Sequence, residues 1–192
     1  MKRIVFITLL TILAGCSISH LQHSGLKNPV QVQSGDVYIR PLATGFTGGK
    51  VGNSRLSIFY IPINPVRIKS DEAKDLINVV TDALLVSGYN VFETNDPEAS
   101  PVLKVHVNEV KFNNYTWAAP IIPTFGKFDV TLTLESKEGL ILWKEGFTGS
   151  GTSFNFFDGY NTAATRAVTK LADQMVDSFS RPNFYLSLKK EE

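Results

Sequence analysis

The sequence has little of the chemistry on which most enzymes depend. Its 192 residues include one cysteine, three histidines, two tryptophans and two methionines. A disulfide bond needs two cysteines, so none forms within this chain. The formal net charge is only +1, and the basic residues are scattered along the chain. The sequence therefore lacks the strong positive field that nucleic-acid binding requires, and we predict no nucleic-acid partner.

Long apolar runs are also missing, apart from a short one near the amino terminus. Lys2 and Arg3 precede this run, which covers residues 4–13. A transmembrane helix needs about 20 apolar residues, so the run is too short to span a bilayer. A basic segment, a short apolar segment and small residues at a cleavage site are typical of a secretory signal.

The single cysteine directly follows this run. The motif Leu13-Ala14-Gly15-Cys16 resembles that of bacterial lipoprotein signals. The resemblance implies cleavage before Cys16 and attachment of lipid to its sulfur and its amine. A thiolate is the nucleophile that a thioether-forming transferase needs. An ordinary secretory signal with a chance cysteine, or a buried first helix, are the alternatives. The lipoprotein interpretation is favoured because four elements agree in order and spacing.

These observations predict the location and the domain organisation. Ser17, rather than an aspartate, follows the cysteine, which resembles the outer-membrane sorting pattern of enteric bacteria. We expect a protein anchored through lipid on Cys16 to the inner leaflet of the outer membrane, facing the periplasm. Residues 1–15 would form the cleaved signal and residues 16–35 a lipidated, flexible tether. A single domain would cover residues 36–186, and a polar tail residues 187–192.

Two segments show the periodicity of amphipathic helices. The first begins near Ser70, with acidic residues in its first turn, and ends at Gly88, which suits the left-handed position after a helix. The second covers residues 160–179 and is terminated by Arg181 and Pro182. Each has an apolar stripe that predicts packing against a sheet.

Strand patterns occupy much of the remaining chain. Apolar and polar residues alternate over residues 36–42, 55–61, 89–93, 102–112, 128–135 and 140–148. The shift of parity near Asn108 and Glu109 predicts a β-bulge. Residues 43–54 are Gly-rich and are predicted to form a loop. The order of elements predicts an α+β fold with a mostly antiparallel sheet of four to five strands and two helices packed on one face.

Candidate catalytic residues are few. His106 lies in a predicted strand, with Asp129 or Glu109 as the carboxylates that could orient it as a general base. His20 and His23 are three residues apart but have no third metal ligand nearby. Gly48-Gly49-Lys50 lacks the serine or threonine of a phosphate-binding loop. We therefore predict that the protein is not an enzyme and that it carries no metal site and no cofactor.

An apolar segment between two predicted strands is the clearest candidate for binding. Residues 115–125 are nearly all apolar and are stiffened by prolines. Connections usually run over the surface, so this segment could dock a partner or a bilayer; alternatively, it folds back over the open end of the core. Because several lipid chains on Cys16 would anchor the protein without help, we favour recognition of a protein partner. The predicted docking residues are Trp117, Pro120, Ile121, Ile122 and Phe125.

Several scattered features together resemble the YajG-type bacterial lipoproteins. They are the helix end Ser87-Gly88-Tyr89-Asn90-Val91, the strand LKVHVNEVKF, a meander with Gly139 and Trp143, and GFTGSG before an Ala-rich last helix. The resemblance covers about residues 36–179 and implies no catalytic residues. We expect a non-enzymatic envelope lipoprotein that serves as a periplasmic protein-binding accessory module. The alternative is a lipid- or glycan-binding carrier in envelope assembly or transport.

Overall fold

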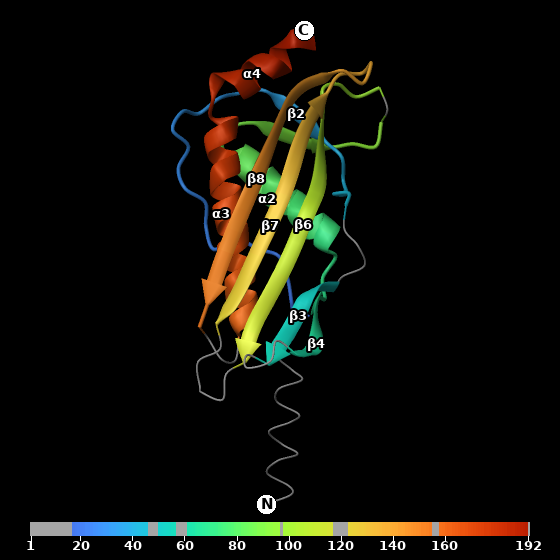
Figure 1. Ribbon diagram of the computed structural model, residues 1–192. Helices are drawn as coiled ribbons and strands as arrows, with labels where there is room; N and C mark the ends of the chain where they lie inside the picture. The colour runs from blue at the N-terminus through green and yellow to red at the C-terminus, as the bar shows by residue number, and fades with distance from the viewer. Residues whose placement is uncertain are drawn as a thin grey trace, which may run out of the picture.

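The computed structural model describes residues 17–45, 50–56, 61–96, 98–116, 123–154 and 158–191, which form one sheet with helices on one face (Figure 1). The strands are β1 (Ser17–Ile18), β2 (Asp36–Ile39), β3 (Lys50–Leu56), β4 (Ile61–Ile68), β5 (Asn90–Glu93), β6 (Val102–Thr116), β7 (Thr124–Glu135) and β8 (Ile141–Ser153). The helices are α2 (Glu72–Val86), α3 (Gly159–Phe179) and α4 (Pro182–Leu188), followed by the 3₁₀ turn η1 (Lys189–Glu191).

The long strand β6 organises the sheet. Along one edge it pairs antiparallel with β7, which in turn pairs antiparallel with β8. Its other edge is shared by three segments that all run parallel to it. Tyr38 of β2 pairs with Val102, Thr44 forms a bridge to His106, and Gly52 of β3 pairs with Phe112. The described sheet is therefore mixed and eight-stranded.

The prediction of a mostly antiparallel sheet of four to five strands with two helices was wrong. The residues predicted as a Gly-rich loop include most of β3, and Pro62 and Pro65 lie within β4 rather than ending a strand. These prolines are tolerated because the far side of β4 pairs with β1 only at Arg67 and Ile68. The parallel pairing of β2 and β3 with β6 joins residues far apart in sequence, which alternation alone does not reveal.

The features predicted for the first helix and for the bulge are confirmed with small shifts. Asp71, not Ser70, is the N-cap of α2, and its carboxylate accepts a hydrogen bond from the backbone N–H of Lys74. Gly88 follows the helix with φ +98°, a conformation that a side chain would strain. The register of β6 against β7 shifts between Val107 and Glu109, where the bulge was expected.

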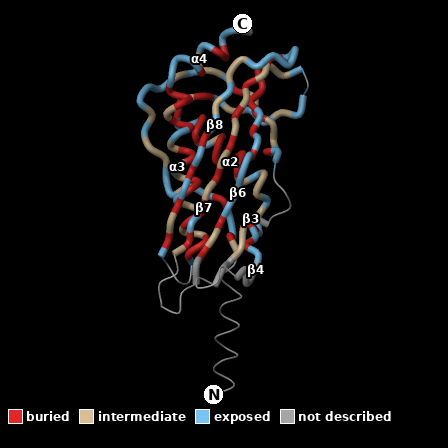
Figure 2. Tube along the Cα trace, in the orientation of Figure 1, coloured by how far each residue is buried: buried red, intermediate tan, exposed pale blue. Residues whose placement is uncertain are grey.

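The core lies between the sheet and the helices α2 and α3 (Figure 2). It is built from the inward rows of the strands and the stripes of both helices; its fully buried members include Leu76, Leu84, Leu103, Phe128, Leu132, Leu134, Val168, Leu171 and Phe179. Within the described part of the chain, no helix is long and apolar enough to cross a membrane.

Helix α3 packs closely on β8 and covers part of that edge strand. Gly149 and Gly151 face the helix, and a Cβ atom on either would overlap a backbone carbonyl of α3. The amide of Gln174 bonds both backbone groups of Thr148, and Arg166 donates to the carbonyl of Thr152. Side chains of α3 thus occupy hydrogen-bonding positions on β8 that would otherwise face an incoming strand.

The carboxyl-terminal region differs from the predicted polar tail. After Arg181 the chain forms α4, with Pro182 in the first helical position. Phe184 is fully buried, and its ring meets those of Tyr89 and Trp143 at centroid distances of 5.4 and 4.9 Å. The three apolar residues Phe184, Leu186 and Leu188 in so short a segment give too weak a pattern for a helix to be predicted. The burial of Phe184 and Leu188 holds the helix against the core.

The amino-terminal segment, residues 17–35, also differs from the flexible tether that the sequence predicts. Ser17 and Ile18 form β1, and Ile18 and Leu21 are buried in the core. Farther along, His23 contacts Asp82 of α2, and Lys27 forms a salt bridge with Asp177 of α3. Polar contacts to two helices therefore hold a segment whose sequence has no periodicity.

Candidate functional site

Most of the predicted site residues lie outside the described part of the chain. These are the predicted signal and lipidation residues Leu13, Ala14, Gly15 and Cys16, and the predicted docking residues Trp117, Pro120, Ile121 and Ile122. Phe125 is described. It lies at the start of β7 and its side chain is 43% exposed.

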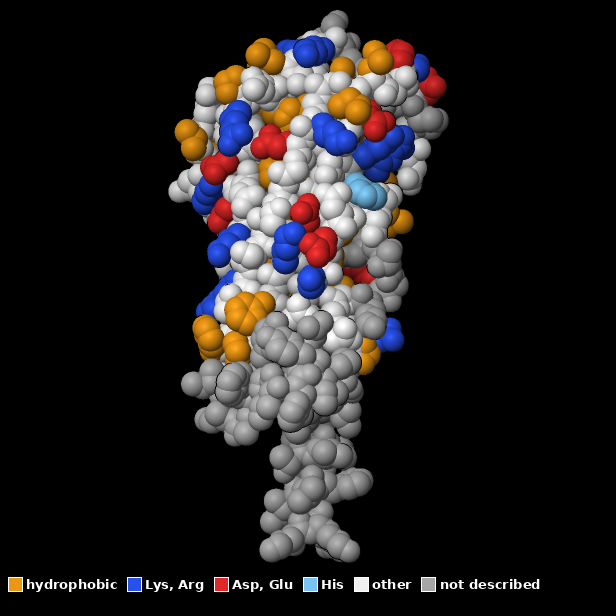
Figure 3. All heavy atoms as spheres, viewed as in Figure 1, with side chains coloured by type: hydrophobic (Ala, Val, Ile, Leu, Met, Phe, Trp, Pro, Cys, Tyr) orange, Lys and Arg blue, Asp and Glu red, His pale blue; other side chains and the backbone are white. Residues whose placement is uncertain are grey.

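Phe125 belongs to one end of the molecule, where several elements meet. Asn114, Thr124 and Ser153 lie side by side near the end of β6, the start of β7 and the end of β8. The end of β3 and the start of β4 lie beside the end of β6, and α3 begins next to Thr124. We call the described residues around Phe125 and Phe154 the strand-end surface. Phe154 is 62% exposed, and apolar side chains are visible at this end in Figure 3.

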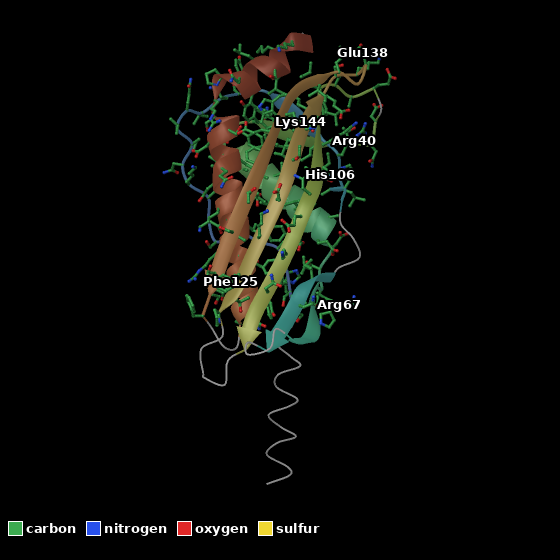
Figure 4. All side chains as sticks on the ribbon, viewed as in Figure 1. Arg40, Arg67, His106, Phe125, Glu138 and Lys144 are labelled. Atoms are coloured by element: carbon green, nitrogen blue, oxygen red, sulfur yellow. The ribbon has the colours of Figure 1, made fainter. Side chains whose placement is uncertain are left out.

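The chain joins the described fold close to the same end. Ser17 pairs with Arg67 of β4, whose side chain is exposed. The backbone N–H of Ser19 donates to the side-chain oxygen of Asn161 in the first turn of α3, at 2.8 Å. Figure 4 shows Arg67 and Phe125 toward this end, while Glu138 marks the opposite end. Ser17, the first described residue, therefore lies toward the strand-end surface.

A basic pocket of about 370 Å³ opens between α3, β8 and the amino-terminal segment. Arg166 and Lys170 stand one helical turn apart at its rim, and Ser24, Thr152 and Thr169 contribute hydroxyl groups. The hydroxyl groups of Ser24 and Thr169 are 3.2 Å apart. The helical periodicity of residues 160–179 places Arg166 and Lys170 on the solvated face of the helix. Their spacing of four residues was the available signal, but nothing in the sequence indicated that Ser24 lies beside them.

The outer face of the sheet is polar and its charges are largely paired. Lys127 donates to Glu109 and Asp129, and Lys104 pairs with Glu135. Hydrogen bonding from Asn108, reinforced by Lys127, keeps the pKa of Asp129 below its usual range. The hydrogen bond from Lys127 likewise lowers the pKa of Glu109. These carboxylates are stabilised in their charged form, which does not suit a general acid.

The candidate base His106 is not joined to either carboxylate by a described contact. Its Nδ1 atom is 3.0 Å from the hydroxyl of Thr44. The partners of Asp129 and Glu109 are instead Asn108 and Lys127. His23 contacts Asp82 on α2. Among the residues that the structure describes, no three histidine, cysteine or acidic side chains are grouped to hold a metal ion.

The acidic residues at the start of α2 have structural roles. Asp71 is the N-cap, as described above. Asp75 accepts a hydrogen bond from the backbone N–H of Leu21 at 2.9 Å and another from the hydroxyl of Ser70. Asp75 therefore fixes the amino-terminal segment to the helix.

A second apolar surface lies at the end opposite the strand-end surface. Leu140 precedes β8 and is 65% exposed, Ile141 begins the strand and is 60% exposed, and Leu186 on α4 is 56% exposed. Helix α4 is held against β8 by the contact between Phe184 and Trp143. We call Leu140, Ile141 and Leu186 the distal apolar surface.

Comparison with known proteins identifies the fold but no family. No family model and no curated protein matches the chain. Among solved structures, protein XCC0632 from Xanthomonas campestris, of family DUF330, is 12% identical, with 93% of this chain and 96% of that chain covered and a TM-score of 0.57. The chain shares its fold with that bacterial protein.

Two further solved structures are similar at lower scores. The PelC dodecamer from Paraburkholderia phytofirmans is 15% identical, covering 79% of this chain and 93% of that one, with a TM-score of 0.40. A minor lipoprotein from Acinetobacter baumannii is 17% identical, covering 69% and 92%, with a TM-score of 0.39. These scores are too low to establish a common fold. The similarity to YajG-type lipoproteins stays a prediction from the sequence.

Proposed function

We propose that the protein is a non-enzymatic envelope lipoprotein whose domain binds a protein partner in the periplasm. Lipid on Cys16 would anchor the domain to the inner leaflet of the outer membrane. On the open sheet face, Lys104 and Lys127 and their acidic partners are engaged in salt bridges, which favours a structural over a catalytic role for these groups. The protein would act by bringing its partner to the membrane.

The distal apolar surface carries this proposal. Leu140, Ile141 and Leu186 are mostly exposed at the same end of the domain, and exposed apolar side chains commonly contribute to a binding site. They lie at the end away from Ser17, so an anchor on Cys16 would leave them accessible. The rigid packing of α4 on β8 would hold them in fixed positions for a partner.

Site-specific photocrosslinking tests the binding role. A photoreactive phenylalanine analogue at Ile141 should give one dominant protein adduct in cells, and Leu186→Asp should remove it. The same analogue at Lys74, an exposed residue of α2, is the control and should give no such adduct. Absence of a protein adduct from both Ile141 and Leu186 would contradict a docking role for this surface.

The anchor is tested separately. Cells grown with an alkyne analogue of palmitate should label the protein, and Cys16→Ser should abolish both the label and the membrane fractionation. If the protein is labelled but no partner is crosslinked, the result supports the anchor and rejects the binding role.

Glycan binding is a second candidate function. A pocket of about 330 Å³ lies between β2 and α4 and is lined by Tyr38, Tyr185 and Asp36. Aromatic faces beside a carboxylate can stack on and hydrogen-bond a sugar ring. Saturation-transfer NMR with envelope glycans should detect binding that Tyr185→Ala removes; no transfer to any glycan would reject this function.

A further inference from the structure

We propose that the strand-end surface rests directly on an anionic lipid bilayer, which orients the distal apolar surface toward the periplasm. This inference rests on the proposed lipid anchor at Cys16 and adds to it the part of the domain that touches the membrane. It assigns Phe125 and Phe154 to the bilayer rather than to a protein partner.

The first argument is the short connection between the anchor and the fold. Ser17 is already paired with Arg67 in the sheet. Consecutive Cα atoms are about 3.8 Å apart, so a lipid-bearing Cys16 would be separated from the sheet by one peptide unit. The packed segment of residues 17–35 provides no slack, because Ile18 and Leu21 are buried. The domain must therefore lie against the membrane on the side where Ser17 emerges.

The second argument is the apolar character of that side. Phe125 and Phe154 are both exposed at the ends of neighbouring strands. Aromatic side chains favour the boundary between head groups and acyl chains. Two such side chains beside an anchored residue would gain apolar burial without any change in the fold.

The third argument is the position of the positive charges. Among the described side chains, none of Arg67, Arg166 and Lys170 forms a salt bridge with a carboxylate, in contrast to Lys127. Arg166 is seven residues beyond the start of α3, which corresponds to about 10 Å along the helix axis. This distance suits contact with lipid phosphates when the helix start lies near the acyl boundary.

The acidic groups at this end offset only part of that charge. Glu109 and Asp129 are both paired with Lys127. Asp158 precedes α3 and accepts a hydrogen bond from the side-chain amide of Asn161. The basic pocket, which Arg166 and Lys170 share with the hydroxyl groups of Ser24, Thr152 and Thr169, can accommodate a phosphate group beside the membrane.

Tryptophan quenching by brominated lipids tests the orientation. The processed chain, residues 16–192, is coupled through the Cys16 thiol to a maleimide lipid in phosphatidylglycerol-containing vesicles. Phe154→Trp and Leu186→Trp each add one fluorophore, and the unsubstituted protein supplies the background. Brominated acyl chains should quench at least half of the fluorescence added by Phe154→Trp and less than a tenth of that added by Leu186→Trp. Equal quenching of the two, or none for Phe154→Trp, would overturn the proposal.

A charge-reversal pair tests the role of the cations. Arg166→Glu with Lys170→Glu should lower the quenching of the Phe154→Trp protein at least twofold. Lys144→Glu with Lys190→Glu changes the same number of exposed charges away from the surface and should leave it unaltered. Equal quenching in the two double variants would overturn the contribution of the basic pocket. Because the coupling is chemical, these results do not depend on lipidation in cells, which the palmitate experiment decides.

Discussion

At the scale of single residues, two glycines of β8 set how closely α3 can approach the sheet. Gly149 and Gly151 face the backbone of α3 at Ala167 and Ala163, where a Cβ atom would overlap a carbonyl oxygen. The alanines on the helix complete this close contact. The close packing of β8 and α3 therefore requires both the glycines of the GFTGSG segment and the alanines of the helix.

Gly151→Ala should lower the free energy of unfolding by about 1–3 kcal/mol, because the added methyl group forces helix and strand apart. Gly146→Ala lies on the same strand, but its methyl group would meet no atom within 4 Å. This control should leave stability unchanged or slightly raised. Urea denaturation measures both, and an equal effect of the two substitutions would contradict the close contact.

Tyr89 should make stability depend on alkaline pH. Its hydroxyl donates to the carbonyl of Phe179, and burial raises the pKa of this phenol well above its usual range. Above about pH 10 the unfolded chain loses the phenolic proton while the folded protein retains it, so stability falls as the pH rises.

Urea unfolding at pH 8, 9.5 and 11 should show this loss of stability. The decline should be shallower in Tyr89→Phe, which has no proton to release. A decline of the same slope in both proteins would show that Tyr89 does not cause it.

At the scale of elements, local signals predicted which segments form helices and strands better than they predicted pairing. Asp71 and Gly88 bound α2 through capping and a positive φ, which are properties of a few neighbouring residues. The parallel contact between Gly52 and Phe112 joins residues sixty positions apart. Such contacts depend on the whole chain, so the alternation of apolar and polar residues identifies a strand but not the strand with which it pairs.

The candidate site was predictable only in part for the same reason. Phe125 is the one predicted docking residue that the structure describes, so the docking segment stays a prediction, whereas the pocket around Arg166 depends on Ser24 from a distant segment. The exposed Leu186 of α4 is held in a fixed position only because Phe184 packs this helix on β8. The sequence shows the type of each residue, but it does not show which distant residues come into contact in the fold.

Phe184→Ala should lower the free energy of unfolding by about 3–5 kcal/mol, since it removes a fully buried ring from an aromatic cluster. Leu186→Ala on the same helix replaces an exposed side chain and should change stability by about 0.5 kcal/mol or less. Thermal unfolding followed by circular dichroism distinguishes them. Similar midpoints for the two variants would mean that α4 does not contribute to the core.

At the scale of the whole molecule, the short connection between Cys16 and Ser17 would determine how a domain anchored through Cys16 stands on the membrane. A flexible spacer of ten Gly and Ser residues inserted between them has an average reach of about 17 Å. It should reduce the quenching of the Phe154→Trp protein by brominated lipids, because the domain can then rotate and withdraw. The same spacer added after Glu192 should have no effect. If the inserted spacer leaves quenching intact, the surface binds lipid without help from the anchor.

The coverage of β8 by α3 has a further consequence for an anchored protein. Molecules confined to a membrane plane, all in one orientation, meet each other far more often than molecules diffusing in three dimensions. Neighbouring copies would present identical edges at the same height, an arrangement that favours polymerisation strand by strand. By occupying both backbone groups of Thr148 and the carbonyl of Thr152, Gln174 and Arg166 remove hydrogen-bonding positions on which such a polymer would grow.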